Sequence, residues 1–441
     1  MQFLDPFSPK SVSPRPFLAI ELIVIFAVTA AALMFGTAGS ADLLAVWSAA
    51  REVALGNPDQ IYTPNAPVFS MRPPEEWLPA LRAAGYQGDV YPYIYPPLWA
   101  WLLAPVVQYV PFEIAVLVMR ALNGIMLVCS LIVARRLCLP DASKGQHVSF
   151  LSIGLAGLLL THSGLIALYE NQPQILVGFL TLLAIERAEN GHQTLGGVAL
   201  ALAAALKAYP ALLAIFWLAT RQRTAIRSFV FTGVALASLS VFLAGWPLHA
   251  EFLATLRTIS NTIVLTPLSL TLDTTLGQLL WPGEFSYVPS LALDITANST
   301  GWFILAKPAV LRALDMLILP VTVLVFAIAY RKLEFIPQAR RVLWPATMAG
   351  LAFVGPLAWS YHFIAPLCAI GLLPICLPRI GYALAGLIIA GLSSPSLFLG
   401  SRPSWPHIPA QLLGSLAVIG LTAALIWIAW IARKAYLGHR M

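Results

Sequence analysis

Long apolar runs separated by polar stretches recur along most of the chain. An α-helix rises about 1.5 Å per residue, so a run of about 20 residues can cross a hydrocarbon core of about 30 Å. We therefore predict membrane-spanning helices over these runs. They cover residues 17–36, 112–135, 147–167, 172–185, 228–245, 311–330, 343–357, 362–377, 380–398 and 412–431.

One further run, residues 195–220, is interrupted at Ala208-Tyr209-Pro210. A proline inside a helix lacks a backbone donor and crowds the preceding turn. We therefore expect a broken helix whose two short halves enter the membrane and return on the same side. A single kinked helix is the alternative. The chain then has about eleven to twelve hydrophobic segments.

Two polar stretches, residues 37–110 and 246–310, are too long to be simple turns. Both contain prolines and aromatic residues, and neither is of low complexity. We expect them to fold over one membrane surface as large loops that carry short amphipathic helices. The chain has no fixed-period repeat and no inverted-repeat halves. Residues 1–441 are therefore predicted to form a single transmembrane domain.

Composition agrees with this pattern. Hydrophobic residues make up 59% of the 441 residues and charged residues only 10%, and the mean hydropathy is +0.80. Soluble domains carry about 25% charged residues, and disordered chains are polar, so both classes are excluded. The fold class is predicted to be an all-α polytopic membrane protein. The four cysteines lie in or beside apolar runs and have no metal-binding spacing.

Basic residues predict the orientation, because Lys and Arg accumulate in cytoplasmic loops. With both termini cytoplasmic and residues 195–220 broken, 17 of the 26 basic residues face the cytoplasm. They are Lys10, Arg15, Arg135, Arg136, Lys144, Arg187, Arg221, Arg223, Arg227, Arg331, Lys332, Arg340, Arg341, Arg379, Arg433, Lys434 and Arg440. The two large loops then face outward. The net charge of +7 reflects this bias, and no nucleic-acid partner is expected.

Polar groups at membrane depth are expensive, so each one is a candidate site. Asp42 follows the first span and precedes Leu43, Val46 and Trp47, which recur at helical spacing. It is predicted to lie in the first turn of an amphipathic helix on the outer surface. Its carboxylate is a candidate site residue, and the alternative is an acid that only caps that helix.

The segment Tyr91-Pro92-Tyr93-Ile94-Tyr95-Pro96-Pro97 precedes the second span at the same surface. Tyrosine rings suit both a membrane interface and the face of a sugar. Tyr93 and Tyr95 are therefore candidate substrate contacts, and an aromatic belt with a proline at a helix start is the alternative.

A cation and a histidine also fall at the outer side. Lys207 lies at the interruption of residues 195–220, where its ammonium could meet a lipid phosphate, although a lysine that extends to the interface is the alternative. Trp359-Ser360-Tyr361-His362 lies between two spans. The His362 imidazole could donate to a phosphate, or could be an interfacial residue only.

Two more polar groups complete this set. Asn171-Gln172-Pro173-Gln174 follows Glu170 on the same side, and Arg120 lies inside the second span, where it needs an acidic or carbonyl partner. A carboxylate, a cation, a histidine and tyrosines at one interface suit a reaction between a lipid-phosphate substrate and an external acceptor.

The order of these motifs resembles the polyprenol-phosphate-mannose-dependent mannosyltransferases of glycosyltransferase family 87, in the GT-C superfamily. The resemblance covers about residues 17–380. Its elements are Asp42 with Trp47, Ala49, Ala50, Gly56, Pro58 and Tyr62, then Tyr93-Ile94-Tyr95-Pro96-Pro97, Gln172, Lys207-Ala208-Tyr209-Pro210, Pro356, Trp359 and His362.

The resemblance implies a GT-C-type helical bundle that transfers a sugar, usually mannose, from a polyprenyl-phosphate donor. It implies that Asp42 is the general base and that Lys207 and His362 contact the donor phosphate. The acceptor would be a hydroxyl of a lipid- or glycan-linked molecule on the non-cytoplasmic side of the cell membrane.

The chemistry adds further expectations. One carboxylate that activates a hydroxyl for direct displacement predicts inversion at the anomeric carbon. Arg257 is a weaker candidate for the phosphate. Sugar or lipid contacts are expected from aromatic and amide side chains, namely Tyr93, Tyr95, Gln172, Trp359 and Tyr361. No second acid completes an Asp-x-Asp pair, so neither a divalent metal nor another cofactor is expected.

Other functions stay open at this point. Another lipid-linked hexose or a pentose could replace mannose. From a different class, a secondary transporter or lipid flippase would also span the membrane many times, but transporters usually place ionisable groups near the midplane and show repeat symmetry.

Overall fold

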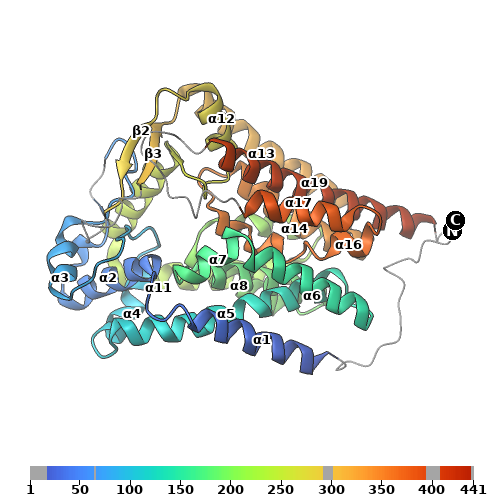
Figure 1. Cartoon of the computed structure of the whole chain (residues 1–441), viewed down its shortest axis with the longest axis horizontal. Coiled ribbons are helices and arrows are strands. Elements are labelled where there is room, and N and C mark those ends of the chain that lie inside the picture. The colour runs from blue at the N-terminus through green and yellow to red at the C-terminus, as the bar shows by residue number, and fades with distance from the viewer. Residues whose placement is uncertain (1–16, 64–65, 292–300, 394–407, 439–441) are drawn as a thin grey trace.

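A computed structural model describes residues 17–63, 66–291, 301–393 and 408–438 (Figure 1). The basic residues Lys10, Arg15 and Arg440 and the last part of the predicted span 380–398 lie outside the described residues.

The described chain is mostly helical. Four helices are long and apolar enough to cross a membrane: α5 (Phe112–Cys138), α11 (Arg223–Ser260), α13 (Ala309–Lys332) and α19 (Ile408–Gly438). A fifth span is possible if α6 (Lys144–Leu159) and α7 (His162–Tyr169), which are bent by 63° at their junction, cross together. The prediction of an all-α polytopic membrane protein is confirmed.

Shorter helices complete the bundle. They are α1 (Leu18–Leu33), α4 (Leu98–Val107), α8 (Gln174–Glu189), α9 (Gln193–Leu206), α10 (Ala214–Ala219), α14 (Pro337–Val354), α15 (Ile364–Leu367), α16 (Leu372–Cys376) and α17 (Gly381–Leu392). The predicted span 362–377 is instead a chain of short helices. Pro366 lies in α15 and Pro374 in α16, and each disfavours a continuous helix through the turn before it.

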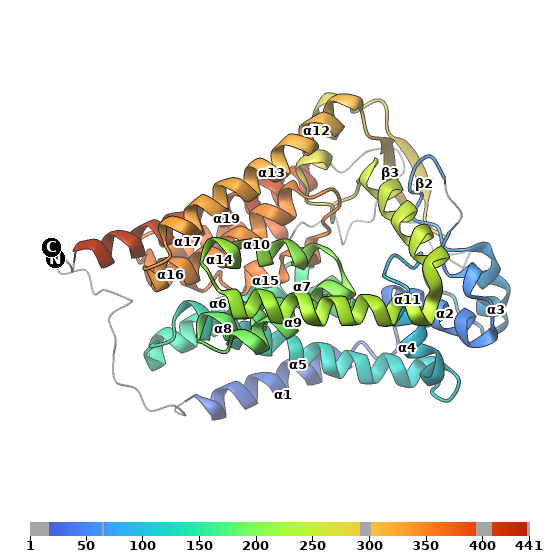
Figure 2. The same cartoon turned by 180° about the vertical axis from the view of Figure 1, so that it is seen from behind.

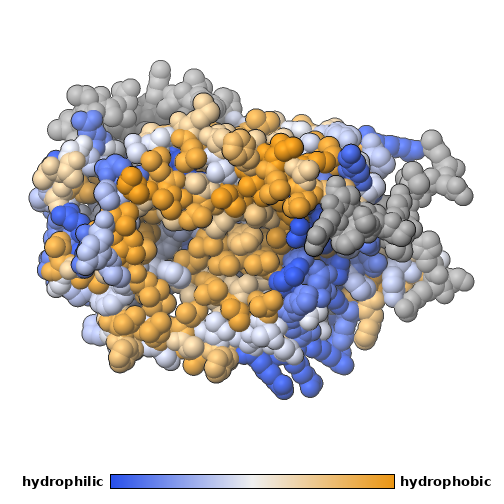
Figure 3. Space-filling model, turned by 90° about the horizontal axis from the view of Figure 1, so that it is seen from below, coloured by the Kyte–Doolittle hydropathy of each residue, from blue (hydrophilic) through white to orange (hydrophobic). Residues whose placement is uncertain are grey.

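A broad hydrophobic band covers one face of the bundle between more polar ends (Figure 3). Large apolar side chains point outward from the long helices, for example Phe231, which is 78% exposed, and Met316, which is 72% exposed. Exposing this much apolar surface to water is unfavourable, whereas lipid chains solvate it.

The chain is broken where the sequence predicts it, beside Pro210, and also at residue 245, where a predicted span ends. Gly245 adopts φ 74° and ψ 161° inside α11, next to Pro247, so the helix bends where the predicted span ends. Lys207 is extended, at φ −141° and ψ 130°, between α9 and the 3-10 helix η3 (Tyr209–Leu213). The segment 193–219 is thus a broken pair.

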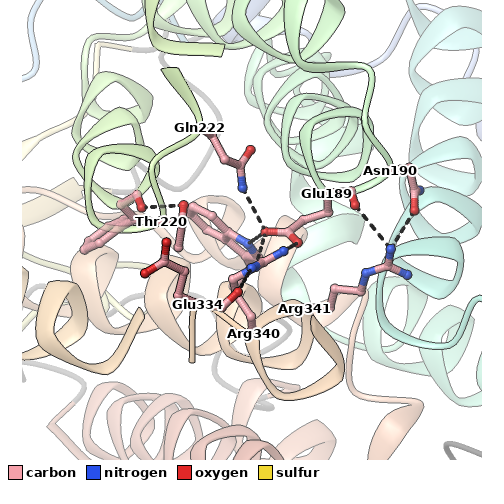
Figure 4. Close-up of polar contacts among 9 residues, drawn as sticks. Glu189, Asn190, Thr220, Gln222, Glu334, Arg340 and Arg341 are labelled. Carbon is pink, nitrogen blue, oxygen red and sulfur yellow. Dashed lines mark hydrogen bonds and ion pairs between the residues drawn. The ribbon is translucent and has the colours of Figure 1, made fainter. Parts of the chain in front are cut away.

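A buried ion pair joins both ends of this broken pair to one end of the bundle (Figure 4). Glu189, at the end of α8, accepts from Arg340 Nε and Nη2 at 2.6–3.0 Å and from Gln222 Nε2 at 3.4 Å. Gln222 follows α10, whereas α9 begins four residues after Glu189. The broken pair therefore starts and finishes at this basic end, where Arg221 also pairs with Glu334 at 3.6 Å.

The two large loops form a layer at the opposite end of the bundle (Figure 2). It contains α2 (Ala41–Leu55), η1 (Pro58–Gln60), η2 (Glu75–Trp77), α3 (Leu78–Ala83), the second half of α11 and α12 (Leu272–Leu280). A small antiparallel sheet, not predicted from the sequence, has the order β1-β3-β2. Its strands are β1 (Thr262–Leu265), β2 (Ser286–Pro289) and β3 (Gly301–Ala306).

Candidate active site

Asp42 is the second residue of α2, one of the helices of the loop layer. The residue that precedes the helix, Ser40, gives α2 no side-chain cap. Instead, the backbone N–H of Ala41 donates to Glu170 Oε2 at 2.9 Å. The first backbone N–H of the helix, which has no partner within the helix, is therefore paired with a side chain from a distant segment. The carboxylate of Asp42 is not needed for this bond and is available for other contacts.

The charge of Asp42 is balanced by Lys207, which is 165 residues away in sequence. Burial raises the pKa of Asp42 to about 6, while the positive charge of Lys207 and the nearby amide of Gln172 act to lower it. Burial lowers the pKa of Lys207 to about 8, and Asp42 opposes that shift. At neutral pH, an ionised carboxylate and an ammonium group thus share one half-buried site.

Aromatic rings surround the Lys207 ammonium. Its Nζ lies 5.4 Å from the ring centroid of Tyr95 and 5.2 Å from that of Tyr361. The hydroxyl of Tyr95 donates to Gln172 Oε1 at 3.0 Å. These contacts connect the break after α9 with the start of α4, the α7–α8 junction and the segment after α14.

His362, in the 3-10 helix η4 (Ser360–Phe363), lies next to this group. Its ring centroid is 5.1 Å from that of Tyr361 and 5.5 Å from that of Tyr209. The backbone N–H of Trp359 donates to His362 Nδ1 at 3.0 Å. Nδ1 also lies 3.2 Å from the carbonyl oxygen of Trp359, so its role as acceptor or donor depends on the tautomer of the imidazole.

The second large loop reaches the site through backbone hydrogen bonds. Leu270 N donates to the carbonyl of Ala358 at 2.9 Å, and Ser360 N donates to that of Leu268 at 2.6 Å. The segment that carries Trp359 and His362 is therefore held by residues from 90 positions earlier.

The predicted site residues fall into three groups. The structure brings together Asp42, Tyr95, Gln172, Lys207, Tyr361 and His362. Tyr93 and Trp359 support this group by packing on its rings, with centroids 5.6 Å from Tyr95 and 6.4 Å from Tyr361, respectively. Arg257 is exposed in the last turn of α11. Its side chain forms no hydrogen bond or ion pair with any described residue.

Three neighbours of the site were not assigned roles from the sequence. Glu170 holds Ala41, and Tyr209 accepts a hydrogen bond from Gln174 Nε2 at 2.6 Å beside His362. Arg120 finds carbonyl partners, Ala38 O at 2.6 Å and Tyr169 O at 3.3 Å. The polar run after α7 and the position of Arg120 inside a span were the available signals, but neither reveals a partner.

The fold and this site define a polytopic membrane protein with a half-buried carboxylate–ammonium centre where the loop layer meets the helix bundle. The model of glycosyltransferase family 87 matches residues 93–360, more than half of the chain. The chain therefore belongs to glycosyltransferase family 87 and is a membrane glycosyltransferase. The match includes Tyr95, Gln172 and Lys207, whereas Asp42 lies 51 residues before its start and His362 two residues after its end. No curated protein matches the chain.

Proposed function

We propose that the chain transfers a sugar from a polyprenyl-phosphate donor to an acceptor hydroxyl, with inversion at the anomeric carbon. The observation that carries this proposal is the electrostatic interaction of Asp42 with Lys207 in one half-buried site of a membrane glycosyltransferase. A carboxylate can activate a hydroxyl, and a cation can stabilise a departing phosphate.

In the proposed reaction, the acceptor oxygen attacks the anomeric carbon while its proton moves to the Asp42 carboxylate. The bond between that carbon and the phosphate oxygen breaks, and the polyprenyl phosphate leaves with the electron pair. Lys207 and the imidazole of His362 stabilise the charge that develops on the phosphate. Tyr95, Gln172 and Tyr361 are the proposed contacts of the sugar.

We propose mannose as the donor sugar, on the resemblance of the motifs, with another lipid-linked hexose or a pentose as the alternative. The acceptor is proposed to be a lipid- or glycan-linked hydroxyl. The experiment uses the purified protein in detergent with polyprenyl-phosphate mannose and a membrane lipid extract. Release of free polyprenyl phosphate together with labelled product supports the proposal. Movement of the intact donor across vesicles without cleavage would favour a flippase.

A bell-shaped pH dependence of kcat/KM is expected. The base must be ionised, so activity should fall as the pH drops through the Asp42 pKa of about 6. The ammonium must be protonated, so activity should also fall as the pH rises through the Lys207 pKa of about 8. Initial rates in overlapping buffers measure both limbs, and a rate that is flat from pH 5 to 9 would contradict both assignments.

We propose that the loop layer faces outward from the cell membrane and that the basic end and both termini face the cytoplasm. The support is the Lys/Arg bias of the loops. Cysteines introduced at the exposed positions Arg51 and Lys332 test it, with the wild-type protein as background. A membrane-impermeant thiol reagent should label Arg51→Cys in intact cells, and should label Lys332→Cys only after permeabilisation. The reverse pattern would invert the topology.

A further inference from the structure

The backbone that leads into α2 is strained. Gly39 and Ser40 both adopt left-handed conformations, with φ of 71° and 73°. A Cβ on Gly39 would lie 2.6 Å from the carbonyl oxygen of Tyr169, so only glycine fits there. A left-handed serine is uncommon and costs free energy, so its surroundings must hold it in place. Asp42 follows two residues later.

A buried polar cluster holds this junction. Arg120 Nη2 donates to Ser40 Oγ at 2.8 Å as well as to the carbonyl of Ala38, and Asn171 Nδ2 donates to the same hydroxyl at 3.0 Å. Ser40 N donates to the carbonyl of Tyr169 at 3.0 Å. The spanning helix α5 and the α7–α8 junction therefore fix the backbone in front of α2.

Glu170 makes the last contact before Asp42. Its Oε2 accepts the N–H of Ala41 at 2.9 Å, which secures the first turn of α2. Burial and the neighbouring charge of Asp42 raise the pKa of Glu170 to about 8, so at neutral pH its carboxyl is protonated and adds no second negative charge. The titratable groups around it are Asp42, Tyr86, Asp89, Tyr91, Arg120, Tyr169 and Tyr361.

We propose that Glu170 is a positioning residue for Asp42: it holds the first turn of α2 through the hydrogen bond to Ala41. The Arg120–Ser40–Asn171 cluster supports that turn by holding Ser40, the residue that precedes it. This inference rests on the proposed function, because the position of Asp42 matters only if Asp42 is the base. A side chain that places the base without touching the donor should affect kcat and leave the donor KM unchanged.

The test compares Glu170→Ala, Glu170→Gln and a control, Glu113→Ala, which changes an exposed acid at the start of α5. Glu170→Ala loses the acceptor for Ala41 and should lower kcat about 10–100-fold, with the donor KM within about twofold. Glu170→Gln keeps an acceptor oxygen and should restore most of that loss. If Glu170→Gln is as inactive as Glu170→Ala, the carboxyl acts through its proton or charge, and the positioning role is overturned.

A second measurement does not depend on the alanine variant folding. Because Glu170 is neutral where Asp42 titrates, Glu170→Gln should leave the midpoint of the acidic limb near 6. A midpoint that moves lower would mean that a charged Glu170 raises the Asp42 pKa in the active enzyme, which overturns the inference. Asp42→Asn separates the two hypotheses: if it is inactive while Glu170→Ala is fully active, only the positioning role fails, whereas an active Asp42→Asn removes the proposed base itself.

Discussion

Asp42→Asn should lower kcat by about 10³-fold or more while donor binding persists. The amide is nearly isosteric with the carboxyl but cannot accept the proton of the attacking hydroxyl, and a positioned general base contributes about 10²–10⁴-fold. The measurement is single-turnover transfer from the polyprenyl-phosphate donor, with donor affinity determined separately by competition.

The matched control is Asp59→Asn, which changes an exposed acid of η1 in the same loop layer and should keep wild-type activity. Both variants are best compared near pH 7. Removing the Asp42 charge also removes a group that keeps Lys207 protonated, so at higher pH a weaker donor affinity would confuse the comparison. Turnover within tenfold of wild type would exclude Asp42 as the base.

The sequence predicts those parts of the fold that depend on local chemistry. Pro210 marks the break beside Lys207, because a proline acts on its own backbone, and the apolar run that ends at residue 245 marks the end of a span. Candidate residues such as Asp42 and Lys207 are recognisable for a similar reason, since each is a charge at the edge of an apolar run.

Contacts between distant segments are not predictable in this way. The β1–β3 pairing joins Thr262 to Ala306 across 44 residues, and no local pattern specifies that register. The cap on Ala41 comes from Glu170, 129 positions away, whereas a sequence reader looks for a cap one residue before the helix. Arg257 illustrates the opposite case, in which a suitable charge near the expected surface shares no contact with the site.

These long-range contacts explain how the site is assembled where the loop layer meets the helix bundle. The strained junction before α2, the break after α9 and the segment after α14 each present one polar group, and none of these is part of a regular transmembrane helix. Regular helices satisfy their own backbone groups, so departures from helical geometry leave donors and acceptors free for side chains and substrates. The site is therefore built where the bundle is least regular.

Lys207→Ala should lower kcat/KM by about 10²–10³-fold, and most of the binding loss should concern the donor. Loss of a charge-assisted contact costs about 1.5–3 kcal/mol in binding, and loss of transition-state stabilisation at the leaving phosphate adds to this. Lys332→Ala, at an exposed position at the basic end of α13, is the matched control and should behave as wild type.

The pH profile of the same variant gives an independent readout. In the wild-type protein the positive charge of Lys207 lowers the pKa of Asp42, so its removal should raise that pKa and move the acidic limb of kcat/KM above pH 6. Lys207→Arg keeps the charge, which should hold the acidic limb near its wild-type position and shift the alkaline limb upward, because an arginine does not lose its proton in this range. If the Lys207→Ala enzyme keeps the donor KM and an acidic limb near pH 6, Lys207 and Asp42 do not interact. The lysine would then have no part in the reaction.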